Sequence, residues 1–291
     1  MQAFEALGVH VYALSYDEPE ALADFAAAHN ITYRLLSDPD SAVIRQFGIL
    51  NTIIAEDDHP WFGIPYPGTY LVDGNGTVTH KFFENNLAVR VGPEQLLRAL
   101  QGDGLPELAD AQPAPAAQAV SVAVYLDGPG LALSVQRDLV VHFKVPDGSH
   151  LYASPAPEGM VAVAIELDAN PLLVLRDMVE PPTTLHRLAN TTERFAVHQG
   201  NVVFRLPVTI NGAVASDDGV AQVTIAGLVR WQSCNDAVCE LPASQRFELT
   251  VAVERPVLPQ IRVPAGQPAA EPRAARHFAQ MTARRQGKSS N

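Results

Sequence analysis

The second half of the chain alternates between apolar and polar residues with a period of two, which predicts half-buried β-strands. Between residues 219 and 231 the apolar positions are Val223, Ile225, Val229 and Trp231, and between residues 246 and 254 they are Phe247, Leu249, Val251 and Val253. In all, strands are predicted at residues 120–126, 131–135, 138–145, 161–167, 172–179, 193–198, 201–210, 220–231 and 246–254. Short strands at this regular spacing, with almost no helical periodicity, predict an all-β sandwich.

The first hundred residues have a different pattern, in which short apolar runs alternate with helix-start signals. Apolar runs at residues 9–15 and 33–36 precede the segments Asp17-Glu18-Pro19-Glu20 and Ser37-Asp38-Pro39-Asp40, which are typical of helix starts. Residues 68–83 then predict a hairpin around a glycine-rich turn at 73–76. A last helix is predicted to begin at residues 92–94. The order strand, helix, strand, helix, hairpin, helix is that of an α/β domain.

A stretch rich in alanine and proline separates the two patterns, and a length of 291 residues favours two domains. We expect a first domain at residues 1–102, a semi-extended linker at 103–119 and a β-sandwich at 120–255. Residues 256–291 are predicted to form a basic, disordered tail, because the chain from Arg255 onward has seven basic residues against one acidic residue. Contact between this tail and an acidic surface is the alternative.

Composition excludes several classes of function. With 47% apolar and 18% charged residues, the chain can bury sizeable cores. A net charge of -12 argues against a nucleic-acid-binding surface. No apolar run is long enough to predict a membrane span. Residues 1–5 lack the basic and apolar regions that open a signal peptide.

The chain has two cysteines, Cys234 and Cys239, which lie between the two clearest predicted strands. Five extended residue steps would separate their Cα atoms by about 17 Å. A disulfide needs about 4.4–6.8 Å, so the chain must turn back if the two cysteines pair. Asn235-Asp236 is a good turn pair, because both side chains can bond to nearby backbone groups.

Three interpretations of this cysteine pair are open. A disulfide over so short a loop stabilises a fold by only about 2 kcal/mol on the chain-entropy model, which favours thiol–disulfide exchange over a structural role. A structural disulfide is the second interpretation, and a pair of inert thiols or a metal site is the third. A closed zinc site needs four ligands, and the sequence supplies no second cysteine pair or nearby histidine. We therefore expect no metal and no cofactor.

Residues 1–102 resemble the peroxiredoxin and redoxin family of AhpC/TSA type. The resemblance rests on Ser37-Asp38-Pro39-Asp40 before a helix that ends at Phe47-Gly48-Ile49, and on the run Pro-Gly-Thr-Tyr-Leu-Val-Asp-Gly-Asn-Gly at residues 67–76. It implies a thioredoxin-like fold, in which Pro67 occupies the place of a cis-proline.

The sequence departs from this family at the reactive cysteine, which should lie on the first strand-to-helix turn. Residues 1–233 contain no cysteine, and the nucleophile in this chemistry is a thiolate. We therefore expect the chain as given to have no peroxidase activity. We also expect the domain to be N-terminally truncated, so that it lacks its first strand and Cys turn. A redoxin domain that has become a binding scaffold is the alternative.

Residues 120–255 resemble the amino-terminal domain of the bacterial thiol–disulfide interchange protein DsbD. The resemblance rests on the segment from Trp231 to Pro242, on the turn Gly148-Ser149-His150-Leu151-Tyr152, and on a strand at 201–208. It implies an immunoglobulin-like β-sandwich in which Cys234 and Cys239 are the catalytic residues and pass electrons to partner thiol proteins. His150 is expected to have a structural role on its turn.

The sequence thus predicts a thiol–disulfide oxidoreductase that exchanges electrons through Cys234 and Cys239 and is attached to a redoxin domain. Its expected partners are redox proteins that carry thiols or disulfides. A non-catalytic protein-binding module, with a structural disulfide and an inert redoxin scaffold, is the alternative. Asp236 and Glu240 would disfavour a thiolate if they lay close to it. The resemblance implies a periplasmic location if an upstream signal has been lost, and a cytoplasmic one otherwise.

Overall fold

The computed structural model describes residues 1–53, 63–83, 89–102, 120–187, 192–211 and 222–254. The predicted linker at 103–119 and the predicted tail at 256–291 lie outside these ranges. The chain divides into two compact units, and the break between them falls after Leu87, so that Ala88–Pro256 form the second unit. Sequence patterns had placed this break later, after residue 102.

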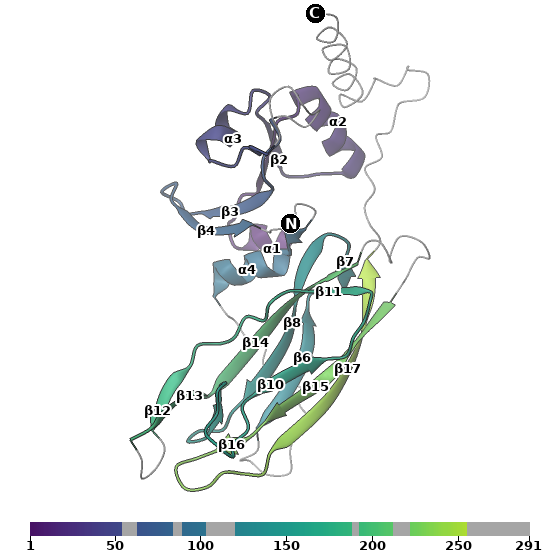
Figure 1. The fold of residues 1–291 in the computed structure, drawn as a ribbon. Helices are drawn as coiled ribbons and strands as arrows, with labels where there is room; N and C mark the ends of the chain where they lie inside the picture. Colours follow the sequence, from purple (N-terminus) through teal and green to yellow (C-terminus); the bar gives the residue numbers. More distant parts are fainter. Residues whose placement is uncertain (54–62, 84–88, 103–119, 188–191, 212–221, 255–291) are drawn as a thin grey trace, which may run out of the picture. The chain divides into compact units, whose positions relative to one another are not determined.

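The first unit contains short helices and two pairs of strands (Figure 1). Its elements are α1 (Gln2–Ala6), β1 (Tyr12–Ser15), α2 (Pro19–His29), β2 (Arg34–Ser37), α3 (Ala42–Gln46), β3 (Gly68–Val72) and β4 (Val78–Phe83). Strands β1 and β2 pair in parallel and are joined through α2, whereas β3 and β4 form the predicted antiparallel hairpin. In the described residues these pairs are separate two-stranded sheets. A single thioredoxin-like sheet therefore stays a prediction.

Both predicted helix starts in this unit are confirmed. Pro19 occupies the first turn of α2, where its missing N–H needs no partner. The carboxylate of Asp38 accepts hydrogen bonds from the backbone N–H groups of Ala42 and Ile44, each at 2.9 Å, and so satisfies donors at the start of α3. Asp38 itself is buried, and Ile44 beside it has no exposed surface.

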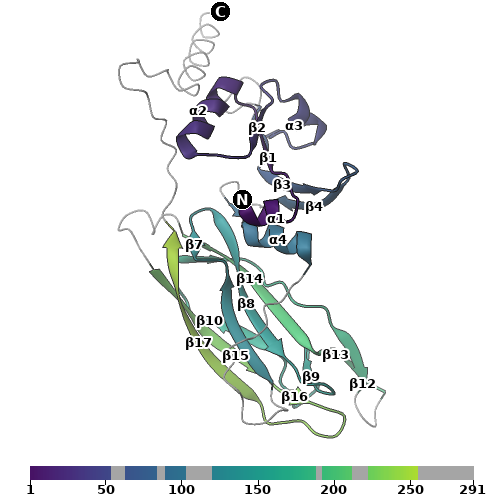
Figure 2. The same ribbon diagram turned by 180° about the vertical axis from the view of Figure 1, so that it is seen from behind.

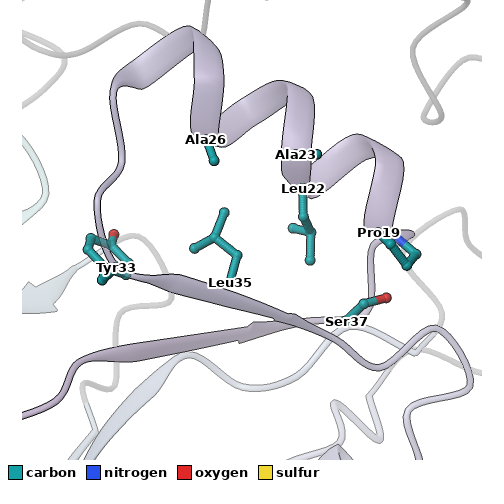
Figure 3. Close-up of a pocket in the computed structure, with 7 residues that line it drawn as sticks. All are labelled: Pro19, Leu22, Ala23, Ala26, Tyr33, Leu35 and Ser37. Atoms are coloured by element: carbon teal, nitrogen blue, oxygen red, sulfur yellow. The ribbon is translucent and has the colours of Figure 1, made fainter.

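A pocket of about 230 Å³ lies between α2 and the strand β2 (Figure 3). Its lining is formed by Pro19, Leu22, Ala23, Ala26, Tyr33, Leu35 and Ser37. The hydroxyl of Ser37 donates a hydrogen bond to the backbone oxygen of Asp17 at 2.6 Å. No carboxylate, imidazole or thiol is among the lining side chains, so the pocket suits apolar contact and not redox or acid–base chemistry.

The second unit is the predicted β-sandwich, with one helix. Its elements are β5 (Arg90–Val91), α4 (Pro93–Gln101), β6 (Ser121–Asp127), β7 (Leu131–Ala132), β8 (Val135–Lys144), β9 (His150–Tyr152), β10 (Ala164–Leu167), β11 (Leu173–Leu175), β12 (Thr184–Arg187), β13 (Arg194–His198), β14 (Asn201–Ile210), β15 (Gln222–Trp231), β16 (Ser233–Cys234) and β17 (Ala243–Glu254). Four of them, β5, β9, β12 and β16, were not predicted.

Two groups of strands face each other across the core of this unit (Figures 1 and 2). In one group β8 pairs with β6 and β14, and in the other β15 pairs with β10 and β17. The short β7 connects the groups by pairing with β8 and β17. Across the core, the ring of Phe143 meets the ring of Trp231 edge-on, with centroids 5.8 Å apart. The apolar face predicted for β15 is buried, since Val223, Ile225 and Val229 are at most 3% exposed.

The remaining strands form a small sheet at one end of the sandwich, in the order β12-β13-β9-β16. Figure 1 shows this sheet at the end opposite to α4. The cis peptide bond found among the described residues, before Pro155, follows β9. The bond before Pro67 is not cis, so the expectation of a cis-proline at that position is wrong.

Helix α4 belongs to the second unit, in which polar and charged side chains hold it to β6 and β8 of the sandwich. Arg98 of α4 donates hydrogen bonds to Asp127 and to Asp138, and Gln95 donates to the other carboxylate oxygen of Asp138 at 2.8 Å. The Asp138 side chain is only 3% exposed, so it depends on these partners for its charge. In addition, β5 pairs in parallel with the start of β8. Sequence patterns could not show these contacts, which join residues about forty positions apart.

We predict that Arg98→Ala will destabilise the sandwich by about 2–4 kcal/mol, because it leaves the buried carboxylate of Asp138 without a cation. Urea unfolding would measure this loss through the fluorescence of Trp231, in a Trp61→Phe background that removes the other tryptophan. Arg246→Ala is the matched control, since Arg246 and its partner Asp168 are both well exposed and their ion pair contributes less than about 1 kcal/mol. Equal losses in the two variants would show that α4 is not held by this buried charge.

Candidate functional site

Cys234 and Cys239 form a disulfide at the tip of a tight hairpin. Their Cα atoms are 4.0 Å apart, and the backbone groups of Asn235 and Val238 bond to each other at 2.9 Å across the turn. The side-chain oxygen of Asn235 accepts hydrogen bonds from the N–H groups of Ala237 and Val238, at 2.9 Å and 2.8 Å. The turn predicted at Asn235-Asp236 is therefore confirmed, and the side chain of Asn235 stabilises it as expected.

The side chain of Gln232 fixes the base of this hairpin. Its oxygen accepts a hydrogen bond from the N–H of Val161 at 2.8 Å, and its nitrogen donates to the backbone oxygen of Glu240 at 2.9 Å. Gln232 itself is 6% exposed, and both bonds are partly buried. A second backbone bond, from the N–H of Glu240 to the oxygen of Ser233, closes the hairpin at 2.8 Å. The base of the hairpin is thus fixed to Val161, and this restrains the movement of the cysteine loop.

The two sulfur-bearing residues differ in exposure. Cys234 is 2% exposed and belongs to a small cluster with Tyr152 and Val197, whereas Cys239 is only partly buried. Beside Cys239, the side chains of Val238 and Leu241 are 62% and 88% exposed. A partner molecule can therefore approach Cys239 over an apolar surface, whereas the buried Cys234 is shielded from such a molecule.

His150 lies opposite Cys234, and His186 and Asp236 follow it one after the other. Strand β16 pairs with β9 so that Cys234 is directly opposite His150. The ring of His150 is 4.2 Å from the ring of His186 on β12, between centroids, and meets Tyr152 edge-on at 5.1 Å. The Nε2 atom of His186 is 3.6 Å from a carboxylate oxygen of Asp236, which lies in the turn between the cysteines. These side chains come from three strands and the cysteine loop. They form one continuous row, in the order Cys234, His150, His186 and Asp236.

Burial controls the protonation of His150. The side chain is 2% exposed, and this burial lowers the pKa of the imidazole below its usual 6.5. The neighbouring His186 lowers the pKa further, whereas the charge of Asp236 opposes the shift. Burial likewise raises the pKa of Tyr152. The row therefore places a neutral imidazole beside the buried cysteine at neutral pH.

The structure brings the predicted site residues together and adds others that sequence patterns missed. Gln232 was noted only as part of a motif, and His186 and Asp236 had no predicted partner. His150 was expected to be structural, although its position opposite a cysteine follows from the unpredicted pairing of β9 with β16. Asp236 is directed to His186, and its side chain is 91% exposed. Only a prediction of these short strands would have revealed the row.

No group of three or more histidine, cysteine, aspartate and glutamate side chains lies close enough to hold a metal ion in the described part of the chain. Among the described helices, none combines the length and apolar character required to cross a membrane.

Comparison with known families confirms both resemblances. Residues 1–81 match the AhpC/TSA family, and residues 128–251 match the N-terminal domain of the thiol:disulfide interchange protein DsbD. The chain therefore combines a redoxin-type segment with a DsbD N-terminal-type domain, whose fold is an immunoglobulin-like β-sandwich.

Curated relatives match a limited part of the chain. Peroxiredoxin Bcp of Escherichia coli is 33% identical over 86 residues, which cover 28% of this chain and 51% of that protein. A putative peroxiredoxin of Mycobacterium tuberculosis is 34% identical over 79 residues, which cover 26% of this chain and 46% of that protein. The chain spans about half the length of the curated relatives it matches.

Solved structures also resemble part of the chain, and two of them are N-terminal domains. The N-terminal domain of DsbD from Neisseria meningitidis in the reduced form has 14% identity and a TM-score of 0.30, and the match covers 45% of this chain and 88% of that one. The N-terminal periplasmic domain of ScsB from Proteus mirabilis has 18% identity and a TM-score of 0.28, with 45% and 44% covered.

We predict that Gln232→Ala will loosen the cysteine hairpin, because it removes both of the partly buried hydrogen bonds that connect Gln232 to Val161 and Glu240, each of which contributes about 0.5–1.5 kcal/mol. Reduction of the disulfide by dithiothreitol should become several-fold faster, and alkylation followed by mass analysis would measure it. Gln232→Glu keeps the acceptor for Val161 and should give an intermediate rate. Gln245→Ala, at an exposed position on β17, should react as the wild type does. Identical rates in all four proteins would mean that Gln232 does not restrain the loop.

Proposed function

We propose that the chain is a thiol–disulfide oxidoreductase, in which Cys234 and Cys239 exchange electrons with a partner thiol protein. The observation that carries the proposal is the asymmetry of the disulfide: one cysteine is buried and the other is partly exposed beside two exposed apolar side chains. A disulfide that only stabilised the fold would gain nothing from an accessible, apolar rim. The match of residues 128–251 to a thiol:disulfide interchange domain supports the same conclusion.

Exchange with a partner disulfide proceeds in two balanced steps. The thiolate of Cys239 attacks one sulfur of the partner disulfide, so that a mixed disulfide forms and the other partner sulfur leaves as a thiolate. The thiolate of Cys234 then attacks the sulfur of Cys239, which forms the Cys234–Cys239 disulfide and releases the second partner thiolate. Two electrons pass to the partner, and the two protons that the cysteines lose are matched by two that the partner thiolates gain. The reverse sequence oxidises a partner dithiol.

The redoxin-type segment takes no covalent part in this exchange, because its residues contain no cysteine. We propose that it has an incomplete thioredoxin-like fold. We also propose that in a complete parent protein the sandwich would supply electrons to a redoxin domain that carries its own cysteine. If the sandwich supplies electrons in this way, substitution of both cysteines by serine would abolish electron flow to a redoxin domain whose own cysteine has been restored.

A protein-binding module with a structural disulfide is the rival function, favoured by the same exposed rim at Val238 and Leu241. The two functions differ in the reduction potential of the cysteine pair. We expect a potential of about -120 to -270 mV, the range of exchange proteins, whereas structural disulfides have values below about -300 mV. Equilibration in defined thiol buffers, acid trapping and mass analysis would measure it. A value in the lower range would favour the binding module.

We predict that Cys239 is the residue that attacks first, because its sulfur is the more accessible. In Cys234→Ser, the remaining Cys239 should react with 5,5′-dithiobis(2-nitrobenzoate) at least tenfold faster than Cys234 does in Cys239→Ser. Release of the coloured thiol in a stopped-flow instrument measures both rates. The two single variants are matched, since each has one thiol on the same hairpin. Equal rates, or a faster Cys234, would reverse the assignment.

A further inference from the structure

The strand beside the cysteine hairpin, β9, contains an imidazole with one buried nitrogen that no described group satisfies. His150 is opposite Cys234 in the antiparallel pair of β9 and β16. Directly opposed residues have Cβ atoms about 4.5–5.5 Å apart, on the same face of the sheet. The Nε2 atom of His150 is buried and has no hydrogen-bond partner among the described residues. A buried polar atom without a partner costs free energy, so its presence beside a cysteine needs a reason.

The row of side chains continues from His150 to the protein surface. His186 is next to His150, with ring centroids 4.2 Å apart, and its Nε2 atom is 3.6 Å from Asp236. The side chain of His186 is 22% exposed and that of Asp236 is 91% exposed, so exposure increases in steps from the buried cysteine to water. His186 and Asp236 are also the charged or titratable groups that shift the pKa of His150, and Tyr152 meets its ring edge-on.

We propose that His150 accepts and returns the proton of Cys234 during thiol–disulfide exchange, and that His186 and Asp236 connect it to solvent. This inference rests on the proposed function. It addresses a problem that the burial of Cys234 creates: the residue is 2% exposed, and burial in apolar surroundings disfavours the thiolate that must attack. It also explains why the orphan imidazole is neutral, because only the neutral form can accept a proton.

The proton transfer fits the second step of the exchange. After Cys239 has formed the mixed disulfide, the thiol proton of Cys234 moves to the free ring nitrogen of His150. The Cys234 thiolate then attacks the sulfur of Cys239, and the partner leaves as a thiolate. The imidazolium of His150, stabilised by the carboxylate of Asp236 across His186, returns its proton to solvent or to the departing thiolate. No further oxidant or reductant is required, since the partner disulfide receives both electrons.

Two other buried histidines show what distinguishes His150. His142 and His198 are also 2% exposed, have pKa values lowered by burial, and have one ring nitrogen without a partner in the described structure. Neither is opposite a cysteine. His142 lies near the end of β8 and contacts Asn201 at 3.3 Å. An unpartnered ring nitrogen alone thus does not indicate a role in proton transfer. What distinguishes His150 is its position opposite the buried cysteine. His142 is therefore a matched control.

The test uses the reduced full chain and 5,5′-dithiobis(2-nitrobenzoate) in sufficient excess that the attack by Cys239 is faster than closure of the disulfide. The first release of coloured thiol reports attack by Cys239, and the second reports attack by Cys234. Mass analysis of the product confirms the internal disulfide. In the wild type, we expect the second phase to slow as the pH falls through the pKa of His150, below 6.5.

In His150→Gln, the second phase should be at least tenfold slower at pH 7 and should lose this inflection, while the first phase changes by less than twofold. His142→Gln should match the wild type in both phases and in their pH profiles. If His150→Gln does not fold, His186→Gln provides the test. This substitution interrupts the row at a partly exposed residue. It should slow the second phase by about threefold to tenfold and shift the inflection in the pH profile of that phase.

The outcomes separate the two proposals. If the wild type forms no internal disulfide, the proposed exchange function fails. If the wild type closes its disulfide and His150→Gln closes it at the same rate with the same pH profile, the exchange function stands and the role of His150 is refuted. If all three histidine variants slow the second phase equally, the effect is structural, and this also refutes the assignment.

Discussion

Antiparallel pairing of β15 with β17 determines where the cysteines are. The ladder continues without a break to Trp231, which is opposite Ala243, so residues 232–242 must leave the sheet and return to the same point. A chain that returns within eleven residues has to turn, and the turn residues Asn235-Asp236 lie at its tip. The register of the two long strands therefore brings the cysteines together. The disulfide then adds little to the stability of the fold.

The same two strands illustrate what could be predicted from the sequence. Their alternation is long and regular, because one face of each meets a continuous core and the other meets solvent, and their positions were predicted correctly. The turn at Asn235 could also be predicted, because its side chain bonds to its own loop. The identity of both segments followed from short motifs, which the family matches confirm.

The sheet that holds the row of histidines could not be predicted. Strands β9, β12 and β16 have two to four residues each, too few for a period to be visible, and polar or titratable residues occupy buried positions in them. His150 is buried because Cys234 and Tyr152 surround it, which is a property of the assembled sheet and not of the local sequence. Likewise, the burial of Asp138 depends on Arg98, forty residues earlier, so the assignment of α4 to the sandwich had no local signal.

The attachment of α4 changes the meaning of the alanine- and proline-rich stretch that follows it. Helix α4 before this stretch and strand β6 after it are both bound to β8, so residues 103–119 begin and end on the same body. The first division between the two compact units falls at Leu87–Ala88 instead, before α4. Because both ends of the stretch are bound to the sandwich, insertions or deletions at 103–119 would not lengthen or shorten that connection between the units. Their cost to the sandwich would also be small, since loop-closure entropy rises only slowly with length. Natural variation in the length of that stretch would then be free of selection on the connection between the units.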